Sequence, residues 1–141
     1  MHLNLLPMVI GVVLAAAVAS GARLIGFERD RAFYATVLMV VASYYVLFAV
    51  MAGSLAMTAA ETALASGFVV LALLGARRSR WYWVLGLALH GVFDVLHPHV
   101  LGNTGVPAWW PPFCLAYDLT AAAYLAVMLR GGSLKSAGGL S

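Results

Sequence analysis

Five ionisable side chains interrupt the apolar stretches of this 141-residue sequence. They are three acids and two histidines, at Glu61, His90, Asp94, His97 and Asp118. A charge in hydrocarbon costs several kilocalories per mole, so an ionisable residue inside an apolar segment predicts a functional site. Imidazoles with carboxylates suit Zn, Fe, Mn or Cu, and the same groups act as general acids and bases. The residue types therefore predict a polar site that holds a metal or transfers protons.

The spacing of residues 90–97 indicates how these side chains converge. His90, Asp94 and His97 follow an i, i+4, i+7 pattern, which places them within about 60° on one face of a helix. We expect these three to ligate a divalent metal, with Zn or Fe as the leading candidates. Glu61 and Asp118 would then be the catalytic acid–base pair, or one of them a further ligand. An interior hydrogen-bond network of protonated acids, without a metal, is the alternative.

Four further side chains are candidates for contact with the substrate or with the ligands. They lie at the depth of the five ionisable residues or near the rim of the same helices, and they are Tyr44, Tyr45, His99 and Cys114. A buried aromatic role for the tyrosines and ordinary packing for the cysteine are equally consistent with the sequence.

The composition sets the class of protein. Hydrophobic residues make up 64% of the chain and charged residues only 9%, with a mean hydropathy of +0.96. A soluble domain carries about 25% charged residues, so this chain is expected in a lipid bilayer. The basic residues are scattered through short connecting segments, which argues against nucleic acid as a partner and for a role in membrane orientation. The single cysteine excludes an intrachain disulfide.

We predict an all-α integral membrane bundle of five transmembrane helices. Gly53 suits a tight reversal, Pro98 is expected to end the fourth helix, and Pro112 to open the fifth. Residues 1–130 would form a single domain and residues 131–141 a flexible tail. Each apolar run is close to the ~20 residues that a bilayer requires, and the expected helices are 4–22, 32–53, 55–76, 81–98 and 112–130.

The positions of the basic residues predict an orientation. All 8 Lys and Arg lie in residues 23–31, 77–80 or 130–135. With five passes these three groups fall on one side of the membrane, which the positive-inside rule makes cytoplasmic. The N-terminus would face outward and the C-terminus would be cytoplasmic.

This topology places the polar residues in the half of the membrane near the outer leaflet. The inner half is expected to be apolar, with few polar groups beyond Tyr34, Thr36 and Ser66. Residues 28–31, which read Glu-Arg-Asp-Arg, are interpreted as a solvated and self-paired loop. The loop from Leu101 to Pro112 would lie over the site as a lid or dip into the interface.

Two stripes of small residues at i, i+4 spacing favour close helix packing. They serve either contacts within the chain or a homo-oligomer, and they are Gly11, Ala15 and Ala19, and Ala59, Ala63 and Gly67.

Two segments carry a family resemblance. Leu89–Pro107, which contains HGVFDVLHPHVLGNTGVP, resembles a family of small uncharacterised bacterial membrane proteins with a similar His-x3-Asp-x2-His followed by a Gly-Asn turn. Gly26–Met51 is similar to sequences of hypothetical proteobacterial proteins. The resemblance implies a multi-pass protein of the bacterial inner (plasma) membrane, and it implies no activity.

The leading hypothesis is a membrane-embedded, metal-dependent enzyme, hydrolase-like or oxidative. Its substrate would be lipid-like or another small apolar molecule, since the site is reached through the bilayer or its outer edge. Three alternatives use the same features: a proton or metal-ion transporter or sensor, a metal-free acid–base isomerase or cyclase, and an accessory subunit of a membrane complex.

Overall fold

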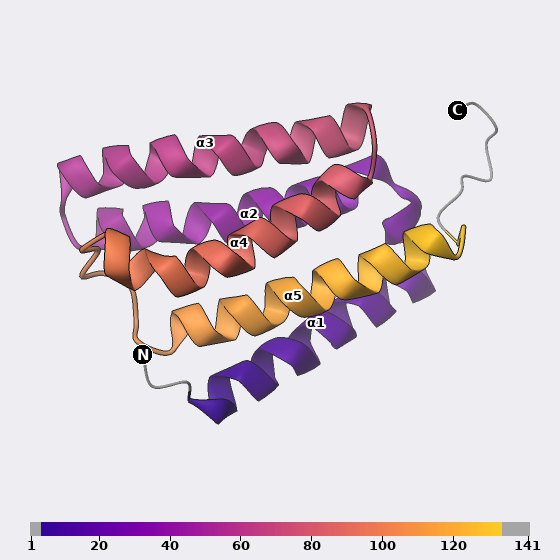
Figure 1. The fold of residues 1–141 in the computed structure, drawn as a ribbon, viewed down its shortest axis with the longest axis horizontal. Coiled ribbons are helices and arrows are strands. Elements are labelled where there is room, and N and C mark those ends of the chain that lie inside the picture. Colours follow the sequence, from indigo (N-terminus) through magenta and orange to yellow (C-terminus); the bar gives the residue numbers. More distant parts are fainter. Residues whose placement is uncertain (1–3, 134–141) are drawn as a thin grey trace.

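The fold is an all-helical bundle. The computed structural model describes residues 4–133, so Lys135 and most of the predicted tail lie outside the described residues. Consecutive helices run antiparallel along one axis (Figure 1). The prediction of five α-helices is confirmed, with bounds α1 (Leu5–Ile25), the 3-10 turn η1 (Phe27–Arg29), α2 (Arg31–Met51), α3 (Leu55–Arg77), α4 (Trp81–Val100) and α5 (Trp110–Arg130).

Four of these helices, α1, α2, α3 and α5, are long and apolar enough to cross a membrane. Much of their apolar surface faces outward, because only 22% of the most apolar window of α1 and 17% of that of α3 is buried inside the bundle. A soluble monomer rarely exposes apolar area on this scale. The chain is therefore consistent with a multi-pass membrane protein. α4 has a similar length, but it carries the polar residues of the candidate site.

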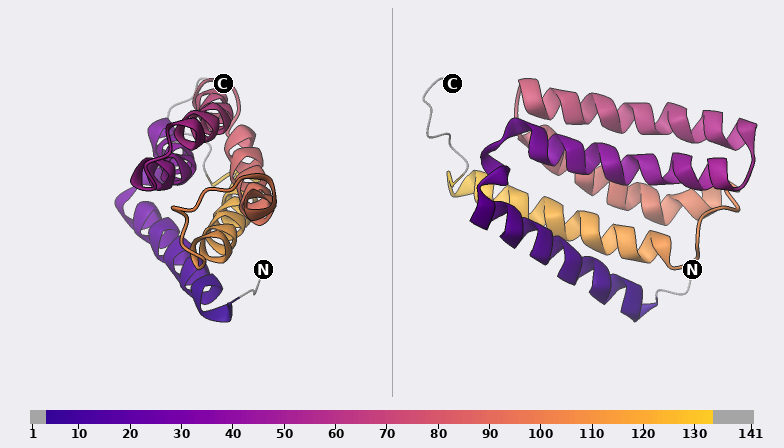
Figure 2. Two further views of the ribbon diagram at one scale, coloured as in Figure 1. Left: turned by 90° about the vertical axis from the view of Figure 1, so that its left-hand side faces the viewer. Right: turned by 180° about the vertical axis from the view of Figure 1, so that it is seen from behind.

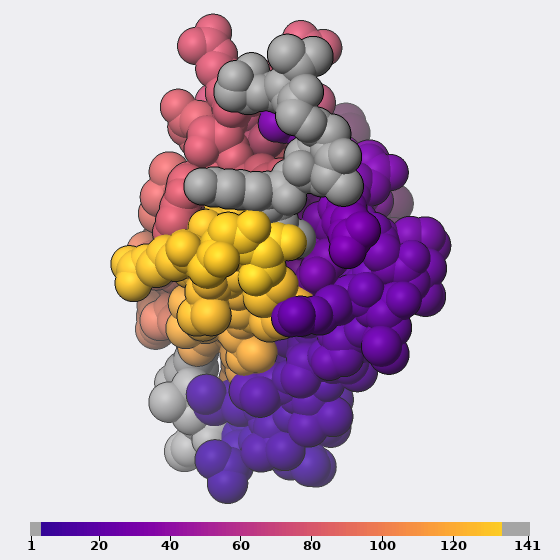
Figure 3. Space-filling view, turned by 90° about the vertical axis from the view of Figure 1, so that its right-hand side faces the viewer, coloured from indigo at the N-terminus to yellow at the C-terminus, as the bar shows by residue number. Residues whose placement is uncertain are grey.

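The two ends of the bundle differ in charge. We call one the arginine end, because residues 23–31, 77–80 and 130 hold every arginine of the chain; Figure 3 looks onto this end. We call the other the loop end, which carries the turn at residues 52–54 and the loop at residues 101–109. α1 begins at the loop end and α5 finishes at the arginine end (Figure 1).

The helix ends show where proline and glycine act. Gly53 makes the predicted reversal with φ of 71°, a conformation that favours glycine. Pro98 does not end α4 as predicted, since the helix continues to Val100. A proline in the last turn removes only one backbone hydrogen bond there. α5 begins at Trp110, two residues before Pro112, because the N–H groups of a first turn need no partner within the helix.

The first stripe of small residues is used within the chain. Gly11, Ala15 and Ala19 are buried where α1 packs on α5, and a side chain at Gly11 would collide with the carbonyl oxygen of Phe113. Figure 2 shows α1 beside α5, farthest from α3. The second stripe faces outward on α3, where nothing lies within 4 Å of a Cβ built on Gly67.

Helices α2 to α5 enclose the core and the polar residues. Trp83 is fully buried, and its indole N–H donates to the carbonyl of Ala72 at 3.0 Å. Its ring occupies the space that a side chain at Gly75 would need, which fixes α4 against α3. Leu38 of α2 fits against Gly86 of α4 in the same way. Tight packing of this kind holds the helical registers that position the site.

The interpretation of residues 28–31 as a solvated, self-paired loop is wrong for its first member. Glu28 is only 5% exposed, and its Oε2 accepts a hydrogen bond from the hydroxyl of Tyr124 at 2.8 Å. Tyr34 of α2 is also buried, and its hydroxyl has no hydrogen-bond partner among the described residues. Asp30 instead caps α2 by accepting from the N–H of Ala32. The arginine end therefore buries more polar groups than the sequence predicts.

Candidate functional site

The inward face of α4 carries the predicted polar residues. His90 and Asp94 are fully buried, and His97 is 2% exposed. The i, i+4, i+7 spacing thus turns all three toward the interior, as a period of 3.6 residues requires. Their partners differ, however, and the five ionisable residues divide into two groups.

The first group lies between α4 and α5. We call it the metal group; its members are His90, Asp94, Cys114 and Asp118, all buried. One ligand atom from each residue lies within 4.8 Å of the other three. Imidazole, thiolate and carboxylate ligands bind a transition metal at about 2.0–2.3 Å, so atoms around one ion lie this close together. The metal group could therefore hold a metal ion.

Close contacts join the members of the metal group. His90 Nδ1 lies 2.6 Å from Asp118 Oδ2 and 3.6 Å from Asp94 Oδ2. Cys114 Sγ lies 3.6 Å from Asp118 Oδ2 and 4.0 Å from His90 Nδ1. Cys114 and Asp118 share a face of α5 because they are four residues apart, and this face meets that of His90 and Asp94 on α4.

Several polar atoms of the metal group have no hydrogen-bond partner among the described residues. They are His90 Nε2, Asp94 Oδ2 and Asp118 Oδ1. Buried polar atoms are nearly always paired, because an unpaired one costs about 1–3 kcal/mol. Two buried carboxylates also need compensating charge, which either a divalent cation or two protons shared with His90 supplies. The donor set and the two unpaired carboxylate oxygens fit a divalent transition metal, with His90 Nδ1 as the ring atom that faces the other members.

The second group lies nearer the loop end. We call it the Glu61 group; it consists of Glu61, His97 and Asn103. His97 Nε2 lies 2.6 Å from Glu61 Oε1, and the side-chain amide of Asn103 donates to the same oxygen at 2.8 Å. Glu61 is 1% exposed, and its Oε2 has no partner among the described residues. The carboxylate orients the imidazole, as in carboxylate–histidine pairs that act in acid–base catalysis.

Tyr45 contacts both groups. Its hydroxyl donates to Asp94 Oδ1 at 2.6 Å, and its ring centroid lies 4.1 Å from that of His97. The amide of Asn103 also donates to the backbone carbonyl of Tyr45, at 3.1 Å. Tyr45 thus hydrogen-bonds a member of the metal group; its role toward a substrate or a metal ligand stays a prediction.

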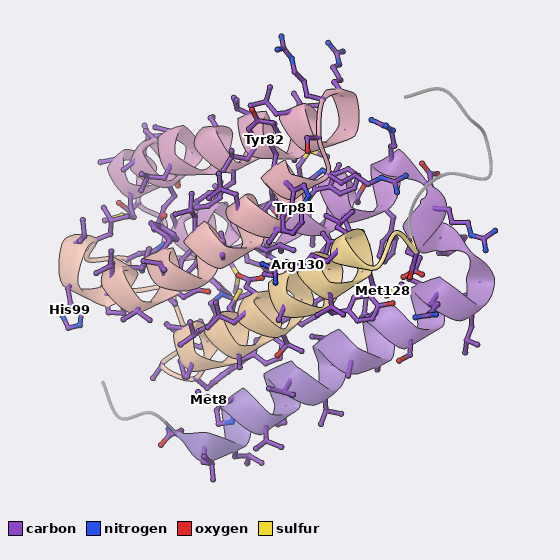
Figure 4. All side chains as sticks on the ribbon, turned by 45° about the vertical axis from the view of Figure 1, so that its right-hand side comes forward. Met8, Trp81, Tyr82, His99, Met128 and Arg130 are labelled. Atoms are coloured by element: carbon purple, nitrogen blue, oxygen red, sulfur yellow. The ribbon has the colours of Figure 1, made fainter. Side chains whose placement is uncertain are left out.

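Other sequence candidates lie elsewhere. His97 does not belong to the metal group, although the sequence suggested it as a ligand, because its Nε2 pairs with Glu61. His99 is exposed at the end of α4, where its side chain points away from the bundle (Figure 4). Tyr44 packs its ring on that of Trp110 at a centroid distance of 4.6 Å. Cys114, a weaker candidate in the sequence, is a member of the metal group.

Asn103 is a site residue that was not predicted from the sequence. The loop between α4 and α5 was expected to lie over the site, and Asn103 joins this loop to α2 and α3 by hydrogen bonds. The sequence did carry a signal for this residue. An asparagine between Gly102 and Gly105, in a loop flanked by prolines, is typical of a tight turn whose side chain bonds to the backbone. Gly105 fits so closely against the backbone of Phe48 that no side chain could replace its hydrogen.

Two cavities lie next to the polar groups. A cavity of about 580 Å³ opens at the loop end and is lined by His97, His99 and Asn103 together with apolar loop residues. A smaller cavity of about 220 Å³ lies among α1, α2 and α5 and is lined by apolar side chains and Cys114. One polar group therefore borders the loop-end cavity, and the other borders an apolar cavity in the side of the bundle.

Comparison with known proteins gives no assignment. No family model matches the chain, and no match was found among curated proteins or solved structures.

Proposed function

We propose that this chain is a membrane-embedded, metal-dependent enzyme that acts on a small apolar or lipid-like molecule. The observation that carries the proposal is the metal group, in which four buried side chains of the right types converge and leave unpaired polar atoms. Buried clusters of this kind cost folding stability and are kept where they serve a function. A divalent metal there would supply Lewis-acid chemistry, or redox chemistry if it is iron or copper.

The residues around the metal group have distinct roles in this proposal. Asp94 and Asp118 hold the ion together with His90, and Cys114 is a fourth, softer ligand. Tyr45 holds the Asp94 carboxylate through its 2.6 Å hydrogen bond. Glu61 and His97 are separate from the ligands and are available to move a proton.

An apolar route to the metal group supports an apolar substrate. The 220 Å³ cavity that reaches Cys114 shares Val40, Val41 and Tyr117 with a second cavity of about 330 Å³. Together they follow α2 from the region of Asp30 to that of Trp110. A molecule dissolved in the bilayer could use this route without crossing water, whereas the metal group itself is closed to solvent.

The proposed orientation places the arginine end in the cytoplasm of a bacterial inner membrane, with all five helices spanning. Cysteines introduced at Ser79 and Thr104 should react with a membrane-impermeant maleimide from opposite sides of oriented vesicles. The parent chain is the control, because its single Cys114 is 1% exposed. Labelling of both positions from one side would refute the five-pass topology.

The first test is the metal content of protein purified in mild detergent without chelators. We expect about one equivalent of zinc, iron, manganese or copper, lost in His90→Gln and in Asp118→Asn. His97→Gln is the matched control, since it changes another buried histidine on the same face of α4 outside the metal group. Equal metal loss in the control, or metal-free parent protein, would refute the metal site.

The second test addresses catalysis. Metal-loaded protein is incubated in nanodiscs made from bacterial lipid extract. The lipids are then analysed by mass spectrometry and compared with those from the same incubation of His90→Gln. A product that forms with the parent chain and not with the variant supports an enzyme. If neither the lipids nor the added isoprenoid and fatty-acyl probes change with protein that is shown to hold metal, the proposed catalysis is contradicted and the metal site is not.

Transport is the second candidate. Glu28, Tyr34 and Tyr124 give the arginine end polar groups of its own, which a conduction path would need. Fully buried Leu38 and Leu87 lie between them and the metal group along α2 and α4, however, and an apolar barrier disfavours the passage of ions. Metal or proton uptake into liposomes that is lost in both His90→Gln and Glu28→Gln would favour transport over catalysis.

A further inference from the structure

The loop-end cavity has the character of a small-molecule site. Its volume of about 580 Å³ falls within the range of about 300–1,000 Å³ that is usual for ligand pockets. The wall is largely apolar, with Leu101, Val106 and Pro107 among its residues, and His97 and Asn103 supply convergent polar groups. A metal ion alone does not require this volume, whereas an organic molecule with an apolar body does.

Two polar groups on the wall, His97 and Asn103, are backed by a carboxylate. His97 and Asn103 both bind Glu61, so the buried carboxylate lies directly behind the cavity wall. When Nε2 of His97 donates to Glu61, its Nδ1 is left as an acceptor, and the described residues supply no partner for it. Glu61 Oε2 is likewise unpaired within the described part of the chain. A ligand that donates hydrogen bonds suits this wall.

The charge around the cavity favours a cation. No lysine or arginine lies at the loop end among the described residues, because all the arginines are at the opposite end. The nearest acidic side chain is Glu61, and the acids of the metal group lie beyond it. Among the described residues an anionic ligand would find no lysine or arginine here, whereas a cation would gain from an acid in surroundings of low dielectric.

We propose that the loop-end cavity is a second ligand site, separate from the metal group, which binds a small organic ammonium ion with an apolar body. The ammonium group donates to His97 and is held by the charge of Glu61, while the apolar body packs against the prolines and leucine of the loop. This site goes beyond the proposed enzyme function. It shares Glu61 and His97 with that proposal, but its test measures binding without metal or turnover, so the failure of one proposal is distinguishable from the failure of the other.

Three matched probes test the proposal: 1-naphthylmethylamine, its neutral analogue 1-naphthalenemethanol and the anion 1-naphthoate. Binding is measured by calorimetry on the full chain in nanodiscs with chelator present, and the signal of empty nanodiscs is subtracted. We expect the amine to bind at least about tenfold more tightly than the alcohol, because only the amine gains from the carboxylate. We expect no measurable binding of the anion.

Glu61→Gln removes the charge and keeps the shape and the acceptor for His97. We expect it to lower the affinity for the amine about tenfold and to leave that for the alcohol nearly unchanged. Glu28→Gln is the control, as it neutralises another buried carboxylate at the arginine end. Equal loss in both variants, or no loss in Glu61→Gln, would overturn the assignment, as would equal affinity for amine and alcohol.

A second variant covers the case in which Glu61→Gln fails to fold. Ala108 is exposed and lines the cavity, so Ala108→Trp should fill the cavity and abolish binding of the amine and the alcohol. Ala59→Trp places the same bulk on the exposed face of α3 and should change nothing. Unaltered amine binding in Ala108→Trp would show that the probe binds elsewhere. Metal content of each variant reports separately on the metal group.

Discussion

Removing the hydroxyl of Tyr45 is the sharpest test of how the metal group is held. Tyr45→Phe keeps the ring that stacks on His97 and deletes only the 2.6 Å hydrogen bond to Asp94 Oδ1. Asp94 is fully buried, and its other oxygen has no hydrogen-bond partner among the described residues, although it lies 3.6 Å from His90 Nδ1. The variant therefore leaves the whole carboxylate without a donor that fixes its orientation.

The size of the effect follows from that contact. A hydrogen bond to a charged group contributes about 1.5–3 kcal/mol, which corresponds to a ten- to hundredfold change in an equilibrium constant. Loss of a residue that orients a metal ligand costs metal affinity by the same factor, about 10–100-fold. We expect Tyr45→Phe to weaken metal binding by this amount while the helical content stays unchanged.

Competition between the purified protein and a chromophoric chelator measures the affinity directly. Tyr44→Phe is the matched control, since Tyr44 is the adjacent tyrosine and packs on Trp110 instead of the metal group. A Tyr45→Phe affinity within twofold of the parent chain would refute the reasoning. An equal loss in Tyr44→Phe would assign the effect to packing.

Two further predictions concern the loop at residues 101–109. Asn103→Ala removes donors to Glu61 Oε1 and to the backbone carbonyl of Tyr45, so we expect a loss of about 1–3 kcal/mol in the free energy of unfolding and faster amide exchange in the loop. Thr104→Ala, at an exposed position of the same loop, is the control. Equal amide-exchange protection in the two variants would contradict the anchoring role of Asn103. Gly105→Ala forces a Cβ into the backbone of Phe48 and should lower the free energy of unfolding by about 1–3 kcal/mol, as measured by thermal unfolding. Gly102→Ala is the control, because a Cβ there meets nothing within 4 Å. Similar melting temperatures for the two variants would contradict the close packing of Gly105 against Phe48.

Much of the fold could be predicted because its signals are local. Apolar runs near 20 residues give the helices, and Gly53 marks a reversal that the chain makes with a positive φ. The 3.6-residue period also places His90, Asp94 and His97 on one inward face. These inferences require only neighbouring residues and the geometry of a helix.

The division of the site into two groups depends on contacts between helices and could not be predicted in this way. Whether Tyr44 or Tyr45 faces Asp94 is decided by the rotation of α2, which apolar residues on all sides of that helix leave open. Cys114 joins the metal group through the register of α5 against α4. Glu28 is buried and accepts a hydrogen bond from Tyr124, 96 residues later, and no local charge pattern reveals that partner.

The position of Tyr45 between the two groups has a thermodynamic consequence. Its hydroxyl binds Asp94 and its ring lies against His97, so a displacement of this one side chain changes the energy of both groups. Linkage requires that a ligand which alters metal affinity through Tyr45 has its own affinity altered by the metal, by the same factor. Binding measured at either site, with the other filled or empty, would give one coupling free energy from two directions.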